Sequence, residues 1–169
     1  GWWYTASLGA RRVLSLHTDS DLVRSEQRFG RGLLEQAMKN PLLEPVLHGC
    51  VATAGEMCSV AAANSLILPR ASGYAWLAAG DAAGALDPLS SRGIFHSLYT
   101  AFAGAMEIDE ALVSGDLNKF DTYAAHITEM GRTNHEQEHL FYQIETRWPD
   151  APFWMRRRAE EQFVAPQSG

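Results

Sequence analysis

The chain begins with two stretches that have the residue pattern of β-strands. Residues 2–8 and 12–18 carry aromatic, β-branched or alternating side chains, and a Gly9-Ala10 pair lies between them. Strand-forming residues on both sides of a short glycine turn predict a β-hairpin. Side chains alternate between the two faces of a strand, so Trp2 and Tyr4 share one face. They either pack the sheet or form a wall of a substrate pocket.

The next part of the chain predicts helices followed by a strand. A polar cluster at residues 18–21 can cap a helix, and apolar residues recur at helical spacing over residues 21–38. The side chains expected to face inward are Leu22, Phe29, Leu33 and Ala37. Asn40-Pro41 stops this helix, because proline lacks the backbone donor that a helix needs. Residues 41–48 predict a further helical turn, and residues 56–68 predict a strand of small side chains.

Residues 76–94 predict a strand, a tight loop and the start of a helix, in that order. A short apolar run ends at Gly80-Asp81, and a loop of small residues follows. From Ile94 onward, apolar residues recur with the period of a helix. The residues that recur at this spacing are Ile94, Leu98, Phe102, Ala105 and Leu112.

The last third of the chain predicts long helices. Ser114-Gly115-Asp116 is typical of a helix stop followed by a new cap. From Leu117 a second apolar stripe keeps helical period, as one long helix or as two with a break near Gly131, and Pro149 ends it. The stripe consists of Phe120, Ala124, Ile127, Met130, Asn134, Phe141, Ile144 and Trp148.

The composition narrows the possible partners. The 169 residues are 46% hydrophobic and 20% charged, with a formal net charge of -6, which argues against a nucleic-acid or anionic-membrane surface. We interpret the basic run Arg156–Arg158 as a solvated tail feature. No apolar run reaches the length of a membrane span, and only Cys50 and Cys58 are present, so a reducing, cytoplasmic setting is expected.

The loop between residues 80 and 94 has the chemistry of a ligand site. A carboxylate at a strand end, here Asp81, can accept hydrogen bonds from sugar-like hydroxyls. A helix N-terminus offers unpaired backbone N–H groups to an anionic oxygen. Gly84 and Gly93 would let a flat ligand approach the backbone. The alternative is an ordinary strand–loop–helix joint, with Asp87 or a serine as the helix N-cap.

Two runs of residues, Gly80-Asp81-Ala82-Ala83 and Asp87-Pro88-Leu89-Ser90-Ser91-Arg92-Gly93-Ile94, closely resemble the second flavin-contacting motif of FAD-dependent monooxygenases and halogenases. The resemblance implies the para-hydroxybenzoate hydroxylase type of fold and FAD as cofactor. It implies that Asp81 contacts the ribityl or ribose hydroxyls and that Pro88 lies beside the isoalloxazine ring. It places the backbone from Ser90 to Gly93 against the N1–C2=O end of the flavin. The cofactor-binding residues that it implies are Gly80, Asp81, Asp87, Pro88, Ser90, Ser91, Gly93 and Ile94.

The N-terminal strand also resembles part of this superfamily. Residues 1–8 stand where tryptophan halogenases carry a Trp-x-Trp-x-Ile-Pro motif. Trp2 matches its first Trp, whereas Tyr4, Ala6 and Ser7 replace the second Trp, the Ile and the Pro. These departures favour a halogenase-like oxidoreductase that lacks halide chemistry, with Trp2 and Tyr4 as candidate residues of its substrate pocket.

The run from Tyr142 to Trp154, together with residues 1–4, resembles a branch of halogenase-like flavoproteins that help mature quinone cofactors by oxidising a tryptophan of a partner protein. The resemblance implies a monooxygenase whose flavin C4a-hydroperoxide, formed with O2, hydroxylates an electron-rich, tryptophan-like ring of a small molecule or a protein. NAD(P)H or a flavin reductase would supply electrons. No catalytic side chain is identified. A flavin-dependent halogenase and a non-enzymatic remnant or interaction module are the alternatives.

The family's first motif, Gly-x-Gly-x-x-Gly, does not occur in the chain. We therefore interpret the chain as the C-terminal part of an FAD/NAD(P)-binding fold of mixed α/β (α+β) class, a single partial domain. Residues 1–68 would form the substrate-side sheet and its helices, residues 74–113 the strand and helix that contact FAD, and residues 114–169 the C-terminal helices. We expect weak or no stable FAD binding by these residues alone.

One further motif points to different chemistry. His135-Glu136-Gln137-Glu138-His139 matches H-E-x-x-H, whose two histidines share one helix face and can bind zinc. The surrounding residues are polar, and no third ligand stands nearby in the sequence. We interpret the motif as a solvated helix face and expect no metal.

Overall fold

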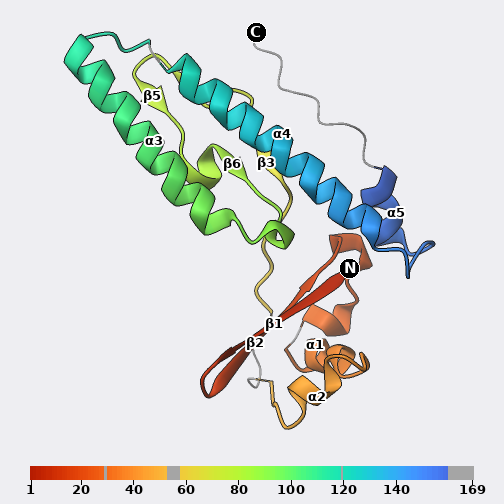
Figure 1. Cartoon of the computed structure of the whole chain (residues 1–169). Coiled ribbons are helices and arrows are strands. Elements are labelled where there is room, and N and C mark those ends of the chain that lie inside the picture. The colour runs from red at the N-terminus through yellow and green to blue at the C-terminus, as the bar shows by residue number, and fades with distance from the viewer. Residues whose placement is uncertain (29, 53–57, 119, 160–169) are drawn as a thin grey trace. The chain divides into compact units, whose positions relative to one another are not determined.

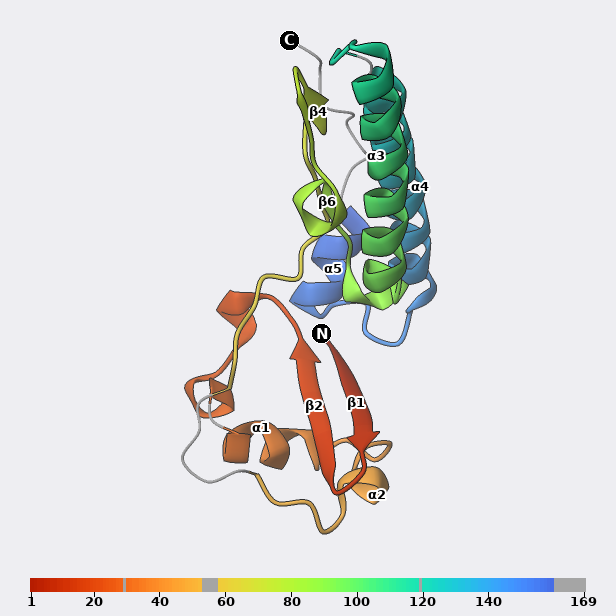
Figure 2. The same cartoon turned by 90° about the vertical axis from the view of Figure 1, so that its left-hand side faces the viewer.

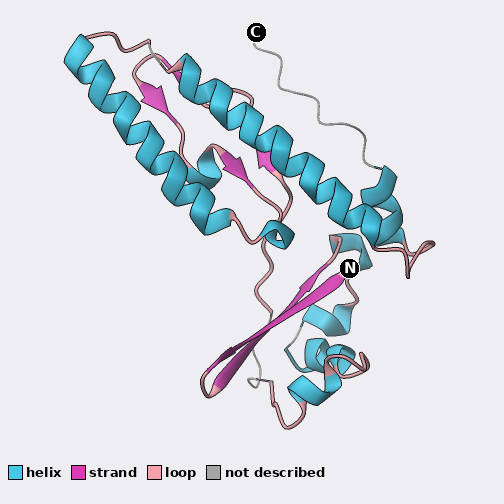
Figure 3. Ribbon diagram, in the orientation of Figure 1, coloured by secondary structure: helices cyan, strands magenta, loops and turns pink. Residues whose placement is uncertain are grey.

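The computed structural model describes residues 1–28, 30–52, 58–118 and 120–159. The chain divides into two compact units. The first unit comprises Gly1–Ala61 and Asp150–Trp154, and the second comprises Ala62–Pro149 and Met155–Gly169. The fold is mixed α/β, with small sheets and long C-terminal helices (Figure 3), as the sequence predicted.

The first unit is built around the predicted hairpin. Strand β1 (Trp2–Leu8) pairs antiparallel with β2 (Arg11–His17), and Gly9 adopts a φ of 70° in the turn. A positive φ is readily reached only by glycine, which explains the residue at this position. Trp2 lies directly opposite His17, and the two rings stack with centroids 3.8 Å apart.

The helix predicted over residues 21–38 is instead three short pieces. They are η1 (Ser20–Leu22), η2 (Ser25–Arg28) and α1 (Gly30–Ala37). Val23 is extended (φ -77°, ψ 121°), so the helical path is interrupted after η1. A Cβ built on Gly32 would lie 1.9 Å from the Glu26 carbonyl oxygen, so η2 approaches α1 where only glycine fits. Phe29 lies outside the described residues.

After α1, the chain makes the short helix α2 (Glu44–Leu47) that residues 41–48 predicted. The strand predicted over residues 56–68 is wrong in most of its described part, because only β3 (Leu66–Ile67) is a strand there. Residues 59–64 are exposed and have no strand partner, and their alanines lack the β-branched side chains that favour a strand. Residues 56 and 57 lie outside the described part.

The second unit places two small sheets along one side of a helix pair (Figures 1 and 2). Strand β3 pairs with β6 (Gly84–Ala85), and β4 (Ser72–Gly73) pairs with β5 (Trp76–Leu77). Each pair is antiparallel. The 3-10 turn η3 (Gly80–Ala82) joins β5 to β6, and the 3-10 turn η4 (Pro88–Ser90) leads from β6 to the first long helix.

The two long helices are α3 (Gly93–Ser114) and α4 (Asp121–Ile144). The predicted stop between them is confirmed: Gly115 adopts a φ of 74° and donates its N–H to the Ala111 carbonyl over 2.9 Å. Helix α4 is continuous, so the alternative of a break near Gly131 is excluded. A Cβ on Gly131 would lie 2.5 Å from Cγ1 of Ile67, which shows that glycine here admits a side chain of β3.

The core of the second unit lies between the strands and the helix pair. Its buried members are Ala71, Ala83, Tyr123 and Ile127, and half-buried apolar side chains pack around them. The Tyr123 hydroxyl donates to the Ala78 carbonyl over 2.7 Å. Burial raises the pKa of Tyr123 above its ordinary value.

The two apolar stripes of helical period are only partly buried. In the second stripe, Phe120 just before α4 and Ile127 on it are buried, whereas Phe141 and Ile144 on α4 and Trp148 beyond its end are exposed. In the stripe of α3, Ile94, Leu98, Phe102 and Leu112 are all exposed. The buried residues of α3 are His96, Thr100, Gly104 and Ala111. Small side chains pack here because the strands approach the helix closely: a Cβ on Gly104 would lie 2.8 Å from Cδ1 of Leu77.

The last described element is α5 (Pro152–Ala159), which contributes residues to both units. Among the described residues, no helix is both long enough and apolar enough to cross a membrane.

Candidate functional site

The turn that carries Asp81 is fixed by glycine geometry and by one hydrogen bond to α3. Gly80 has a φ of 60°, and a Cβ there would lie 3.2 Å from Oγ of Ser97. The Gly80 N–H donates to Oγ1 of Thr100 over 2.8 Å, and Thr100 is fully buried. Asp81 is exposed next to this fixed point. The structure therefore presents the Asp81 carboxylate to solvent from a rigid turn.

Asp87 holds the next turn through both of its carboxylate oxygens. Oδ1 accepts the Leu89 N–H over 2.7 Å, and Oδ2 accepts the Tyr142 hydroxyl over 2.8 Å. The Asp87 carbonyl also accepts the Ser90 hydroxyl over 2.8 Å. Asp87 is only 8% exposed. Asp87 caps the 3-10 turn η4, whereas Arg92 holds the N-cap position of α3, so the alternative in which Asp87 caps the predicted helix is wrong. The Asp87 side chain has little freedom to reach a ligand.

A second contact ties this turn to α4. The backbone N–H of Asp87 donates to Oγ of Ser65 over 2.9 Å, and that hydroxyl donates to Oε2 of Glu138 over 2.5 Å. Tyr142 and Glu138 lie one helical turn apart on α4. The loop before α3 is therefore anchored to α4 at two successive turns, which sequence reasoning missed because the partners are far apart along the chain.

The N-terminus of α3 follows directly and is open. Ser91 has a φ of 53° and donates its N–H to the Pro88 carbonyl over 3.0 Å. Arg92 occupies the N-cap position, and no side chain caps the helix. A Cβ built on Gly93 would meet no atom within 4 Å. The backbone N–H groups of Ser90, Ser91 and Arg92 are donated within the protein, so the donors available at this end of α3 begin at Gly93. The assignment of Ser90, Ser91, Gly93 and Ile94 to the cofactor site stays a prediction.

Gly84 has a different role from the one that the sequence suggested. A Cβ there would lie 2.6 Å from Cδ1 of Ile67 and 3.7 Å from Nε2 of His96. The glycine therefore admits side chains of the protein itself. His96 is 2% exposed, and neither ring nitrogen has a hydrogen-bond partner in the described part of the chain. Nothing in the sequence around His96 indicated that this histidine would be buried.

Trp2 and Tyr4 belong to the first unit, in β1. Trp2 is half-buried against His17, whereas Tyr4 is 51% exposed. Their role as walls of a substrate pocket stays a prediction.

The H-E-x-x-H motif lies on α4, and its acidic side chains are engaged with other residues. Glu136 pairs with Arg132, and Glu138 accepts the Ser65 hydroxyl. His139 Nε2 lies 2.5 Å from Nε2 of Gln143. Among residues 1–28, 30–52, 58–118 and 120–159, no group of three or more His, Cys, Asp or Glu side chains could hold a metal ion.

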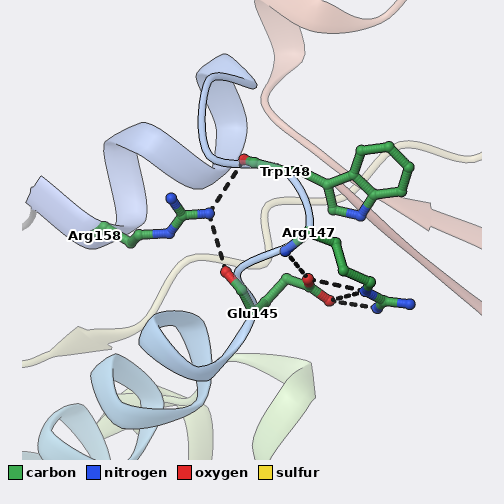
Figure 4. Close-up of polar contacts among 4 residues, drawn as sticks. All are labelled: Glu145, Arg147, Trp148 and Arg158. Atoms are coloured by element: carbon green, nitrogen blue, oxygen red, sulfur yellow. Dashed lines mark hydrogen bonds and ion pairs between the residues drawn. The ribbon is translucent and has the colours of Figure 1, made fainter.

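The basic run at residues 156–158 is only partly the solvated feature that we expected. The Arg158 guanidinium donates through Nη2 to the carbonyls of Glu145 (3.0 Å) and Trp148 (3.1 Å), as Figure 4 shows. These carbonyls follow the last turn of α4, where a cation is favourable because a helix ends in unpaired acceptors. Arg157 lies over the Tyr142 ring, 5.7 Å from its centroid. The run therefore holds α5 against the end of α4.

The carboxylate of Glu145, directly after α4, has a shifted pKa that can be measured. Arg147 donates from its side chain and from its backbone N–H to the Glu145 carboxylate, and this lowers the pKa of Glu145 to about 2. An unfolded glutamate titrates near ~4.3, so the ionised form is favoured in the folded state. The stabilisation is present above that value and is lost as the pH falls toward the folded-state pKa of about 2. An NMR carboxyl titration should show the low pKa, and Arg147→Ala should raise it; Arg31→Ala should leave it unchanged.

A protein of Marinomonas mediterranea named "Putative FAD-dependent oxidoreductase LodB" is 30% identical over 162 residues, which cover 94% of this chain and 42% of that relative. The chain thus spans less than half the length of the relative that it matches. No family profile matches the chain. No solved structure matches it either.

Proposed function

We propose that this chain is the flavin-contacting part of an FAD-dependent oxidoreductase. The observation that carries the proposal is the geometry of residues 80–94. An exposed carboxylate, Asp81, stands on a rigid turn, and the same segment leads to an uncapped helix N-terminus at Gly93. The similarity over 94% of the chain to a relative named as an FAD-dependent oxidoreductase supports the same conclusion.

The described residues have the donor and acceptor chemistry that FAD requires. The Asp81 carboxylate would accept hydrogen bonds from the hydroxyls of the ribityl or ribose groups. The backbone N–H groups at the start of α3 would favour a flavin oxygen that carries negative charge, because a helix N-terminus is electropositive. The open space at Gly93 would let a flat ring approach this backbone. Pro88 is exposed in the same loop, where it could flank the ring.

Other residues of the segment would act by holding it in position. Asp87 and Gly80 use their polar groups within the protein, so we assign them to positioning of the turn. Bound FAD would supply electron transfer and oxygen activation, which side chains alone do not provide. The chain would contribute orientation of the flavin and stabilisation of charge on it.

We further propose that the whole protein is a cytoplasmic monooxygenase that hydroxylates an electron-rich, tryptophan-like ring. O2 would be the co-substrate, and NAD(P)H or a flavin reductase the electron source. The support is the resemblance of residues 80–94 and 142–154 to halogenase-like flavoproteins. The departures at Tyr4 and Ser7 from the halogenase motif favour hydroxylation over halogenation. Trp2 and Tyr4 remain the proposed residues of the substrate pocket.

The first test is to read the coding sequence upstream of Gly1. We expect an open frame that encodes a strand, a Gly-x-Gly-x-x-Gly turn and a helix. The protein purified from that full frame should show the visible absorbance of bound flavin. Asp81→Ala should raise the Kd for FAD at least about tenfold, and so lower flavin occupancy at limiting FAD, since one charge-assisted hydrogen bond contributes ~1.5–3 kcal/mol.

Asp150→Ala is the matched control, because Asp150 is an exposed aspartate outside the segment. It should leave flavin occupancy unchanged. A full product with no flavin absorbance, or equal occupancy in the two variants, would contradict the proposed role of Asp81. A frame that starts near Gly1 would favour a remnant or binding module.

A further inference from the structure

Within the second unit, helix α3 buries small and polar residues and exposes its large apolar side chains. The face that packs against the strands and α4 carries His96, Thr100, Gly104 and Ala111. The opposite face carries large apolar side chains, which we call the outer face of α3. Its members include Ile94 (81%), Phe95 (67%), Leu98 (69%), Phe102 (67%), Met106 (61%) and Leu112 (70%).

The outer face is too apolar to be an ordinary helix surface. With about 3.6 residues per turn, these six side chains fall on one half of the helix circumference. Residues 93–106 contain no Asp, Glu, Lys or Arg. A covered aromatic side chain buries ~150–250 Å², so six large side chains that are mostly exposed exceed the ~300–600 Å² patch of a typical monomer. A patch of this size marks an interaction surface.

Charge decides against two of the possible occupants. Asp109 lies on the outer face itself and Glu110 lies at its edge, and α3 has no Lys or Arg. A membrane-surface helix usually presents cations beside its apolar face, so a lipid surface does not fit. In a parallel pair of α3 helices, Asp109 would face Asp109. In an antiparallel pair centred on Phe102, it would face Phe95. A second copy would therefore bury carboxylates without a cation.

We propose that the outer face of α3 docks the remaining part of a longer polypeptide, the part that corresponds to the length of the relative outside the match. This inference rests on the proposed function, because the longer oxidoreductase supplies the occupant. The chain covers only 42% of the relative, so a body of sufficient size to cover a 22-residue helix is available there. The occupant presents an apolar surface with a Lys or Arg opposite Asp109.

Cysteine labelling in the product of the full reading frame tests this directly. Cys50 and Cys58 are first replaced by serine, and one new cysteine is placed by Leu98→Cys or by Ala125→Cys. Leu98 lies on the outer face, and Ala125 is an exposed residue of α4. For each variant, the labelling rate in the native protein is divided by the rate of the same cysteine in the denatured protein. This normalised rate should be at least about tenfold lower at residue 98 than at residue 125.

Several results would overturn the proposal. Labelling at residue 98 as fast as at residue 125 means that the face stays open. If residue 98 is protected only at high protein concentration, where ultracentrifugation shows a dimer, a second copy of the chain is the occupant. A reading frame confined to these residues removes the proposed occupant. Protection without flavin absorbance in the same sample supports docking while the proposed function fails, so the two failures are distinguishable.

Discussion

Replacing Asp87 with alanine should destabilise the protein by about 3 kcal/mol, the largest effect we expect at the loop before α3. The substitution removes the acceptor for the Leu89 N–H and for the Tyr142 hydroxyl at once. Tyr142 is 2% exposed, so water cannot readily replace the lost acceptor for its hydroxyl. The free energy of unfolding from urea titration is the measurement.

Variants at the same pair of residues separate the two hydrogen bonds. Asp87→Asn keeps an acceptor for Leu89, and its amide can donate to the Tyr142 oxygen, so a loss of about 1 kcal/mol is expected. Tyr142→Phe should cost about 1.5 kcal/mol. The double variant Asp87→Ala, Tyr142→Phe should lose about 1 kcal/mol less than the sum of the two single losses, because one hydrogen bond is shared. If Asp87→Ala lowers the free energy of unfolding no more than the exposed control Asp150→Ala, the turn does not depend on this carboxylate.

The local signals in the sequence were sufficient for elements that depend on neighbouring residues. The hairpin at residues 2–17 and the α3 stop at Gly115 follow from turn and capping chemistry, and the structure has both. The Asp87 side chain also caps a local turn, although that turn is η4 and not the predicted helix α3. Each of these features is decided by residues close together along the chain.

The features that the sequence could not predict depend on distant residues. Tyr142 reaches Asp87 across 55 positions, and nothing in the pattern of either segment indicates the other. Residues 56–68 alternate like a strand, but a strand needs a partner, and within residues 58–68, which the structure describes, only Leu66–Ile67 pairs with another strand, β6. A residue pattern can show that a segment is able to form a strand, but it does not show whether the fold places a partner strand beside it.

The apolar stripe of α3 shows a further limit of periodicity. Such a stripe indicates which side of a helix is suited to burial, but it does not say what covers that side. In the second unit the stripe is exposed, and the small residues on the other side pack instead. Under the docking that we propose, the remaining part of a longer polypeptide would cover the stripe.

Gly131→Val should destabilise the protein by about 2–3 kcal/mol, even though valine is a better helix former than glycine. A Cβ at this position would lie 2.5 Å from Cγ1 and 2.7 Å from Cδ1 of Ile67, so the β3 side chain would have to leave its site between α4 and β6. Ala125→Val, on an exposed position of the same helix, should cost only about 0.5 kcal/mol from propensity. Both losses are measured by urea unfolding.

Removal of the blocking side chain should rescue the variant. Ile67→Ala vacates the space that the introduced valine side chain would enter, so the double variant should lose at least about 1 kcal/mol less than the sum of the single losses. Additive losses would mean that Gly131 is required for another reason, such as contact with residues outside the second unit. Because Ile67 also meets Gly84 of β6, the rescue would show that one side chain locks the strand pair preceding the Asp87 turn onto α4. The packing of α4 and the position of the candidate flavin loop would then both depend on the Ile67 side chain.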